Sequence, residues 1–144
     1  MSDEARLIEK LKRIEALFAG AATQGERAAA ANAMQRIRGR LKEIHKTEPP
    51  TEFKFRLTDM WSRRLLVALL RRYGIRPYRY RRQKHTTVMA KVSERFVEET
   101  LWPEFRELDN TLRTYLDEIT DRVIREGIYS DTSEAEIMKE SIEG

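Results

Sequence analysis

Residues 59–73 read DMWSRRLLVALLRRY, and the centre of this stretch is apolar without interruption over six positions. The pattern predicts one helix. Thr58 precedes it as a residue type that caps helix N-termini, and Gly74 follows it at a usual C-terminal position. A helix that is apolar nearly all round is covered by other elements, so we expect residues 59–73 to form the central buried helix.

Two arginine pairs, Arg63–Arg64 and Arg71–Arg72, are expected to mark the wet ends or edge of this helix, and Trp61 is expected in the core. The uncharged apolar run is too short for a membrane span, which needs about 20 residues, or for a signal-peptide core of about 7 to 15. The first residues, MSDEAR, carry no basic region followed by an apolar stretch. We therefore expect a cytoplasmic protein with no membrane partner.

Two β-prone segments follow the central helix, IRPYRYRR at 75–82 and TTVMAKV at 86–92. The short polar QKH between them predicts a β-hairpin, and Pro77 restricts its strand to an edge position. Because side chains alternate along a strand, the first strand should have two different faces. One face carries Arg76, Tyr78, Tyr80 and Arg82, and the other carries Ile75, Pro77, Arg79 and Arg81.

The stretch 71–85 contains seven Arg or Lys, three Tyr and no acid, within a chain whose net charge is +4. Residues 1–60 carry 12 basic and 9 acidic side chains, residues 61–92 carry 10 and none, and residues 93–144 carry 6 and 15. Such asymmetry either recruits a polyanion to the middle of the chain or lets the acidic end cover the basic stretch.

The first alternative is a non-catalytic protein that binds nucleic acid through residues 71–85. Arginine forks bind phosphates bidentately, and tyrosines between them can stack on exposed bases. The expected phosphate contacts are Arg76, Arg79, Arg81, Arg82 and Lys84, and the stacking candidates are Tyr78 and Tyr80. No helix-turn-helix, zinc-finger or RNP pattern accompanies them, so the sequence does not distinguish DNA from RNA as the partner.

The second alternative is an oligomeric scaffold or protein-interaction module, in which the arginines of 71–85 meet Asp and Glu from residues 94–143. These carboxylates belong either to the same chain or to a second subunit, most simply in a homodimer. In that case the acidic end covers a basic strand. Deleting residues 129–144 separates the alternatives, because it disrupts assembly or exposes the basic stretch only in the second.

Upstream of the central helix, two consecutive prolines lack donors and favour extended geometry, so we expect a linker at 47–57. Before it, apolar residues at three- and four-residue spacing predict two helices that pair as a hairpin over 1–46. The first carries Leu7, Leu11, Ile14 and Phe18, and the second carries Ala30, Met34, Ile37, Leu41 and Ile44. Thr23 and Glu26 have the capping-box spacing at the start of the second helix.

Downstream, Ser93 caps a short helix, and Pro103 fits the first turn of a long helix that ends at Gly127. About 24 residues at 1.5 Å each make a helix of roughly 36 Å, so part of its apolar face is expected to meet another subunit. Residues 128–144 form an acidic tail. It either folds as a short amphipathic helix or stays disordered until it docks, with its apolar side formed by Ile137, Met138 and Ile142.

These elements divide the chain into a helical hairpin at 1–46, a linker at 47–57, a core at 58–127 and an acidic tail at 128–144. The core consists of the central helix, the β-hairpin and the long helix. We therefore predict an α+β fold that is mostly helical. A chain of 144 residues buries about 70% of its unfolded surface, so it needs no metal or disulfide to hold a core.

Catalytic patterns are missing from the sequence. Cysteine is absent, which excludes disulfides, thiolate nucleophiles and Cys-ligated zinc. The two histidines, His45 and His85, lie forty residues apart and form no metal-binding spacing such as HExxH. Glycine-rich nucleotide loops and the GxSxG elbow are also absent. We therefore expect no enzyme, no metal site, no cofactor and no small-molecule substrate.

Two segments resemble known kinds of protein. The first 45 residues, with a Leu/Ile first helix, a turn carrying Gly25 and Glu26, and an alanine-rich second helix, resemble an uncharacterised helical-hairpin domain of bacterial and phage proteins. The segment VMAKVSERFVEETLWPEFRELDNTL, residues 88–112, resembles conserved hypothetical bacterial proteins. The resemblance implies a bacterial or phage setting and transfers no functional residue to this chain.

Overall fold

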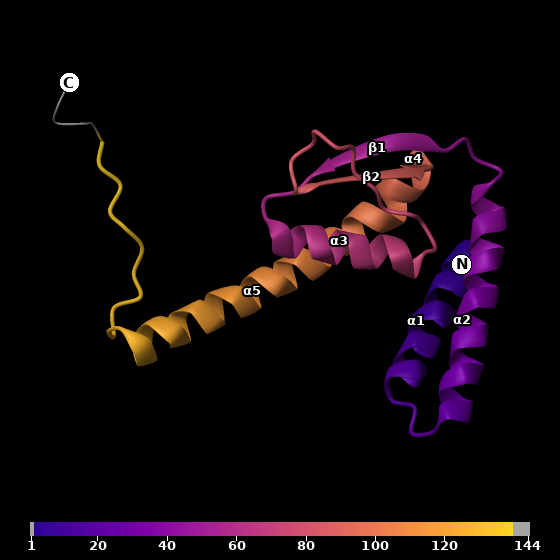
Figure 1. Ribbon diagram of the computed structural model, residues 1–144, viewed down its shortest axis with the longest axis horizontal. Helices are drawn as coiled ribbons and strands as arrows, with labels where there is room; N and C mark the ends of the chain where they lie inside the picture. The colour runs from indigo at the N-terminus through magenta and orange to yellow at the C-terminus, as the bar shows by residue number, and fades with distance from the viewer. Residues whose placement is uncertain (1, 140–144) are drawn as a thin grey trace. The chain divides into compact units, whose positions relative to one another are not determined.

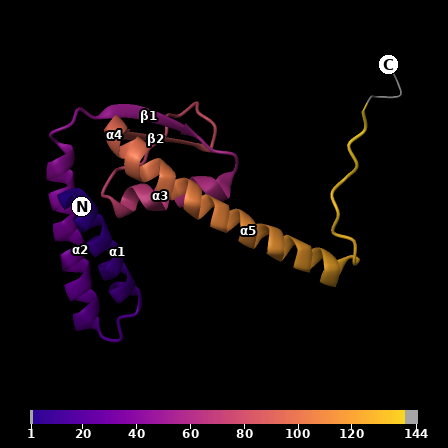
Figure 2. The same ribbon diagram turned by 180° about the vertical axis from the view of Figure 1, so that it is seen from behind.

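The computed structural model describes residues 2–139, and its elements confirm the mostly helical α+β class. The chain folds as two compact units, Met1–Arg106 and Glu107–Gly144. Residues 140–144 of the expected acidic tail, which include Ile142, lie outside the described residues. The first unit contains both strands and every helix except most of α5, and Figures 1 and 2 show it from opposite sides.

Helices α1 (Asp3–Ala19) and α2 (Gln24–His45) lie side by side and form the predicted N-terminal hairpin (Figure 1). Each helix begins at a side-chain cap, because the hydroxyls of Ser2 and Thr23 accept a hydrogen bond from the backbone N–H three residues on. The predicted cap at Thr23 is therefore confirmed. The buried stripes consist of Leu7, Ile8 and Leu11 on α1 and of Ala30, Met34, Ile37 and Leu41 on α2.

Helix α3 (Met60–Arg72) is the predicted central helix. Its N-cap is Asp59 rather than the expected Thr58, because the Asp59 carboxylate accepts a hydrogen bond from the N–H of Ser62 at 2.9 Å. Gly74 follows the end of the helix with a φ of 72°, in the left-handed region that glycine adopts without strain. The buried side of α3 consists of Ser62, Leu66, Leu69 and Leu70.

The other side of α3 faces solvent. Trp61 has 54% of its surface exposed, so the expectation that it belongs to the core is wrong. Arg64, Ala68 and Arg71 are also exposed. These four positions follow each other at spacings of three and four residues and therefore share one helix face. The apolar run is thus covered on one side, and the opposite side is an aromatic and basic surface.

The sheet consists of two antiparallel strands, β1 (Thr51–Arg56) and β2 (Thr87–Val92). The predicted strand at 86–92 is confirmed, but its partner is β1, and the expected hairpin with residues 75–82 is wrong. Within 75–82, the pairing with β2 is an isolated bridge at Tyr78. Cations on both faces and a proline without a donor make this segment a poor partner for β2, which is buried at every position except Lys91.

The linker expected at 47–57 is wrong over its second half, where residues 51–56 form β1. The two prolines precede the strand, so their missing donors cost no hydrogen bond of the ladder. Within the strand, Phe53 and Phe55 alternate with charged residues and turn toward the core, where Phe55 is buried and Phe53 half-buried. The alternation of TEFKFR was the sequence signal for this strand.

Three helical segments follow β2 without a break: α4 (Glu94–Phe96), the π-helical turn η1 (Val97–Leu101) and α5 (Trp102–Gly127). Ser93 caps α4 by accepting a hydrogen bond from the N–H of Phe96 at 3.2 Å, as predicted. Pro103 occupies the first turn of α5, directly after the wide π turn, which accommodates a residue that cannot donate. The predicted short helix followed by a long one is confirmed.

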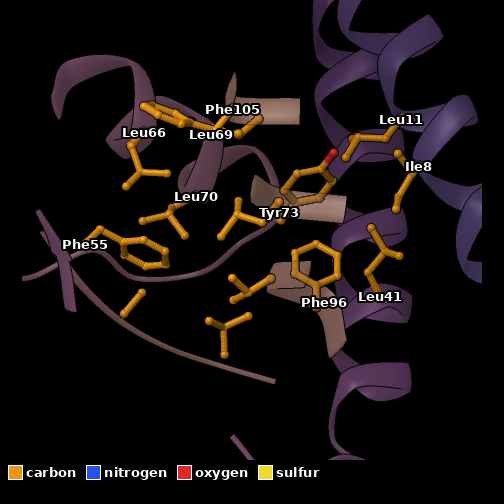
Figure 3. Packing of buried hydrophobic residues seen from close by; sticks show 14 of the residues in the cluster. Ile8, Leu11, Leu41, Phe55, Leu66, Leu69, Leu70, Tyr73, Phe96 and Phe105 are labelled. Atoms are coloured by element: carbon orange, nitrogen blue, oxygen red, sulfur yellow. The ribbon is translucent and has the colours of Figure 1, made fainter. Parts of the chain in front are cut away.

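The core of the first unit joins the helical hairpin to α3 and the sheet. Figure 3 shows Tyr73 and Phe96 lying between the hairpin leucines and the leucines of α3, and their rings pack edge to face with centroids 5.2 Å apart. At the other end of the core, the ring of Trp102 stacks between Phe55 and Phe105, at centroid distances of 5.7 and 4.9 Å.

The second unit consists of α5 from Glu107 onward and the residues after it. Residues 130–139 form no helix, so over the described part of the tail the amphipathic helix is not present. Several apolar side chains of this part of α5 are exposed, namely Leu108, Tyr115, Ile119 and Val123. No helix within residues 2–139 combines the length and the apolar character needed to cross a membrane.

Candidate functional site

Residues 75–86 connect α3 to β2 as an irregular loop, which we call the basic loop. The N–H of Tyr78 donates to the carbonyl oxygen of Met89 at 3.0 Å, and the N–H of Met89 donates to that of Tyr78 at 2.7 Å. Because Tyr78 uses both backbone groups of Met89, the loop occupies the edge of β2 opposite β1. The predicted basic segment is therefore fixed to the sheet although it is not a strand.

Two tyrosines of the basic loop are held by one carboxylate of β1. The hydroxyls of Tyr78 and Tyr80 both donate to Oε2 of Glu52, that of Tyr80 at 2.5 Å, and the two rings meet edge-on with centroids 5.7 Å apart. We call these three residues the tyrosine clamp. The two donated hydrogen bonds lower the pKa of Glu52 and raise the pKa of Tyr78 and of Tyr80, because they favour the carboxylate and the neutral phenols.

The clamp changes the role expected of the tyrosines. The ring of Tyr78 is half-buried, and the guanidinium carbon of Arg76 lies 5.4 Å from its centroid, so a cation already covers that ring. Tyr80 has 51% of its surface exposed. Of the two stacking candidates, Tyr80 therefore has a ring that a ligand can reach. At Tyr78, the guanidinium of Arg76 already lies over the ring.

The turn at 80–83 is closed by side chains of the loop itself. Nη1 of Arg79 donates to the carbonyl oxygen of Gln83 at 2.6 Å, and Oε1 of Gln83 accepts from the N–H of Tyr80 at 2.9 Å. Within residues 2–139, the hydrogen bonds of Arg79 all come from Nη1. Nε and Nη2 of its five-donor guanidinium remain available to an acceptor outside the chain.

A hollow of about 440 Å³ lies between α3 and the basic loop. We call it the arginine hollow, because three of its arginines come from α3 and one from the loop: Arg63, Arg64, Arg71 and Arg79. Its walls are completed by Val67, Ala68, Pro77, Tyr78 and Val88. Nε of Arg63 is buried and has no hydrogen-bond partner within residues 2–139. A buried donor without an acceptor is costly to the fold.

Helical spacing explains why the α3 arginines gather at the hollow. Arg64, Ala68 and Arg71 follow each other by four and three residues and line one side of α3 toward the loop. Ala68 leaves open space between two long side chains. From the sequence, Arg64 and Arg71 are expected at the wet ends or edge of α3, and neither is among the expected phosphate contacts. The spacing itself was the signal that could have found them.

Two further hollows adjoin the same loop. The lysine hollow, of about 420 Å³, has as its cations Lys42, Lys46, Arg76 and Lys91. The strand hollow, of about 500 Å³, has as its cations Lys54, Arg56, Arg82 and Lys84. No Asp or Glu lines the arginine hollow, the lysine hollow or the strand hollow. The basic loop contributes residues to all three hollows, so each of these cationic depressions adjoins the loop.

Five carboxylates of the first unit are engaged by Arg72 and Arg95. Arg72 binds Glu15 at 3.0 Å and Glu104 at 2.5 Å. Arg95 binds a second set of carboxylates at 2.6 to 3.0 Å, from Glu4, Glu48 and Glu99. The hydrogen bonds that Arg95 donates to Glu4 and Glu48 raise the pKa of Arg95, and those that Glu48 accepts from Ser93 and Arg95 lower the pKa of Glu48. Within residues 2–106, none of the cations in the three hollows forms an ion pair.

The expected site residues are thus distributed around the loop. Arg79 lies in the arginine hollow, Arg76 in the lysine hollow, and Arg82 and Lys84 in the strand hollow. Arg81 is exposed and lines none of these three. The other alternative from the sequence is that the chain's own acids neutralise the basic stretch. Within the first unit, Arg72 is the residue of that stretch that forms such ion pairs.

The histidines do not contribute to these hollows as metal ligands. Nε2 of His45 lies 3.2 Å from Oε2 of Glu4, and its ring packs against Phe96, whereas His85 is exposed. Within residues 2–139, no three His, Asp or Glu side chains are grouped to hold a metal ion. Comparisons with protein-family models, with curated proteins and with solved structures find no match to this chain.

Proposed function

We propose that the protein is a non-catalytic, cytoplasmic binding protein that takes the phosphate backbone of DNA or RNA onto its basic loop. The observation that carries the proposal is the set of three hollows around this loop, each with four cations and no Asp or Glu. Cations gathered without carboxylates repel one another, and a bound polyanion replaces that repulsion with attraction.

A polyanion suits this arrangement better than one small phosphate. The twelve cations are divided among three separate depressions that share the basic loop. A nucleic acid carries a phosphate at every nucleotide and can occupy several depressions at once, which raises its affinity without new kinds of contact. The arginines can grip phosphates bidentately, and the lysines act as point charges.

Each expected residue has a role in this proposal. Arg79 acts with the α3 arginines, and Arg76, Arg82 and Lys84 act in the hollows that they line. Arg81 contacts phosphate from its exposed position on the loop. Tyr78 holds the loop to β1 instead of stacking on a base, whereas Tyr80 keeps an accessible ring.

The test is binding of labelled single- and double-stranded oligonucleotides at two salt concentrations, measured by fluorescence anisotropy. If about five phosphates are neutralised, the duplex slope is about −4.5, and raising salt from about 50 to about 200 mM weakens binding about 500-fold. The double variant Arg64→Ala/Arg71→Ala should bind at least about tenfold more weakly and reduce the slope by about 2.

The matched control is Arg36→Ala/Arg40→Ala, which removes two exposed arginines from α2, outside all three hollows. It should leave affinity within about twofold of the parent protein, because distant exposed charges contribute little at moderate salt. Equal losses in both double variants would mean that net charge, and not the hollow, drives binding. Absence of binding at micromolar protein and low salt would refute the proposed function.

A second candidate function is self-association, and an observation in the second unit favours it. Leu108, Tyr115, Ile119 and Val123 recur along α5 at spacings of seven, four and four residues and remain 37 to 60% exposed. Such a stripe is typical of a helix that pairs with another helix. We propose a second copy of this chain as the partner, which corresponds to the expected homodimer.

Sedimentation of the purified chain tests this candidate. Ile119→Asp places a charge in the stripe and should convert a dimer into a monomer, whereas Thr114→Asp, on an exposed position away from the stripe, should leave the dimer intact. A monomer at all concentrations in the parent protein would rule out self-association. This outcome would not affect the nucleic-acid proposal, whose residues all belong to the first unit.

A further inference from the structure

Trp61 is an exposed aromatic side chain at the N-terminal end of α3, and 54% of its surface is accessible. Exposed tryptophans are costly to leave in water, since an indole carries one of the largest apolar surfaces among the side chains. Neither the tyrosine clamp nor the core cluster includes it. The exposed indole therefore offers a surface on which a ligand with a flat apolar face can stack.

Trp61 does not line the arginine hollow, but it lies about one helical turn before Arg64, which does. Arg64, which lines the hollow, follows Trp61 by three residues, so the two side chains share a helix face and lie about 4.5 Å apart along the axis. An aromatic platform and a phosphate-binding depression thus adjoin on one surface of α3.

We infer that α3 binds a single-stranded segment of nucleic acid, with a backbone phosphate in the arginine hollow and a neighbouring base stacked on Trp61. This inference rests on the proposed function and specifies its substrate class. A nucleotide joins one phosphate to one base, which is the pair of groups that this surface offers to receive. In a duplex both faces of each base are already stacked, so the indole selects unpaired strands.

The arginine side of this site also fits a phosphate. Arg63, Arg64 and Arg71 present guanidinium donors from one helix at the wall of the hollow. Phosphate oxygens accept several such bonds at once, and Arg forks match their geometry. These hydrogen bonds form with the phosphate backbone of any sequence, and an indole can stack on every base. The site therefore has no strong sequence preference.

The second tryptophan of the chain provides an internal reference. Trp102 is half-buried, and its ring stacks between Phe55 and Phe105 at centroid distances of 5.7 and 4.9 Å, so both of its faces are already in use. A base cannot stack on it without opening the core. Any change of tryptophan fluorescence caused by stacking should therefore come from Trp61 alone.

The experiment uses the full chain with single-stranded oligothymidylate of about 12 nucleotides, and the duplex of the same length as comparison. Binding is followed by anisotropy of a labelled strand and, separately, by quenching of intrinsic tryptophan fluorescence. Trp61→Ala should weaken single-strand binding by about tenfold and leave duplex binding within about twofold. Trp61→Phe keeps a stacking ring and should retain most of the single-strand affinity, but the quenching signal should disappear with the indole.

Met60→Ala is the matched control, because Met60 is exposed at the neighbouring position and 43% of its surface is accessible. It should leave both affinities unchanged. Far-ultraviolet circular dichroism confirms that each variant remains folded, which substitution of exposed side chains permits.

The outcomes separate the inference from the proposed function. Single-strand binding that Trp61→Ala leaves unchanged, or quenching that survives in Trp61→Phe, overturns the stacking inference while nucleic-acid binding stands. Equal weakening of single-strand and duplex binding by Trp61→Ala also overturns it, because stacking on a free base cannot act on a duplex. Absence of binding to either oligonucleotide overturns both proposals together.

Discussion

The hydroxyl of Tyr73 donates a hydrogen bond to Oε2 of Glu104 at 2.7 Å, which joins the end of α3 to the start of α5 inside the first unit. Tyr73 is 2% exposed, and the same carboxylate accepts a hydrogen bond from Arg72 at 2.5 Å. Burial and the contact with Glu104 raise the pKa of Tyr73, so this phenol stays neutral and remains a donor over the physiological range.

Tyr73→Phe removes this hydrogen bond and keeps the ring that packs on Phe96. We expect the free energy of unfolding to fall by about 1.5 to 3 kcal/mol, the usual cost of losing a hydrogen bond to a charged group. Urea denaturation measures the loss. Tyr129→Phe, at a position 70% exposed, is the control and should change stability by less than about 0.5 kcal/mol. Equal effects of the two substitutions would contradict a stabilising role for the Tyr73–Glu104 bond.

Removal of the clamp carboxylate should release the basic loop. In Glu52→Ala, Tyr78 and Tyr80 lose their shared acceptor, and we expect trypsin to cleave after Arg79, Arg81, Arg82 or Lys84 faster than in the parent protein. Mass spectrometry of the fragments over time measures the rate. Glu98→Ala, which removes an exposed acid from η1, should leave the loop as resistant as before. The same cleavage rate in both variants would show that the clamp does not order the loop.

The clamp also predicts an alkaline titration. Hydrogen bonding to Glu52 raises the pKa of Tyr78 and Tyr80 above the ordinary 10.0. The two hydrogen bonds therefore stabilise the fold fully below pH 10, and this stabilisation is lost as the pH rises through the raised pKa values of the folded protein. Glu52→Gln keeps an oxygen acceptor but removes the charge, so both phenols should ionise at lower pH. Tyrosinate absorbance follows the titration, and superimposable curves for the two proteins would count against the clamp.

Replacing two glycines by alanine should change the free energy of unfolding in opposite directions. Gly74 has a φ of 72°, where a side chain is strained, so Gly74→Ala should cost about 1 to 2 kcal/mol. Gly39 lies inside α2, and a Cβ added there meets nothing within 4 Å, so Gly39→Ala should gain about 0.5 to 1 kcal/mol. Urea midpoints test both. Destabilisation by Gly39→Ala would mean that α2 has a neighbour at that position.

The helices could be predicted from the sequence because their signals are local. The caps at Thr23 and Ser93 and the apolar spacing of the first two helices depend on residues within one or two turns of each other. Strand β1 could not be recognised in the same way, because two prolines suggested a linker and its partner lies more than thirty residues along the chain. Strand pairing depends on which distant segment offers a matching buried face, as Phe53 and Phe55 do here.

The candidate site was predicted in part. Charge alone located the basic loop, since 61–92 contains no acid. The contribution of Arg63 and Arg64 depends on how α3 packs beside the loop, which no local pattern encodes. The role of Tyr78 was misjudged for a related reason, because Glu52 belongs to the segment interpreted as a linker. The exposure of Trp61 likewise follows from which side of α3 the core covers, a tertiary property.

The basic loop contains two kinds of position. Tyr78, Tyr80 and Gln83 hold the backbone, whereas within residues 2–139 the side chains of Arg81 and Arg82 form no hydrogen bond or ion pair. Substitution of the first group removes contacts that hold the loop, and substitution of Arg81 or Arg82 removes none. The charge that the loop presents at these two positions can therefore change while its backbone keeps the same conformation.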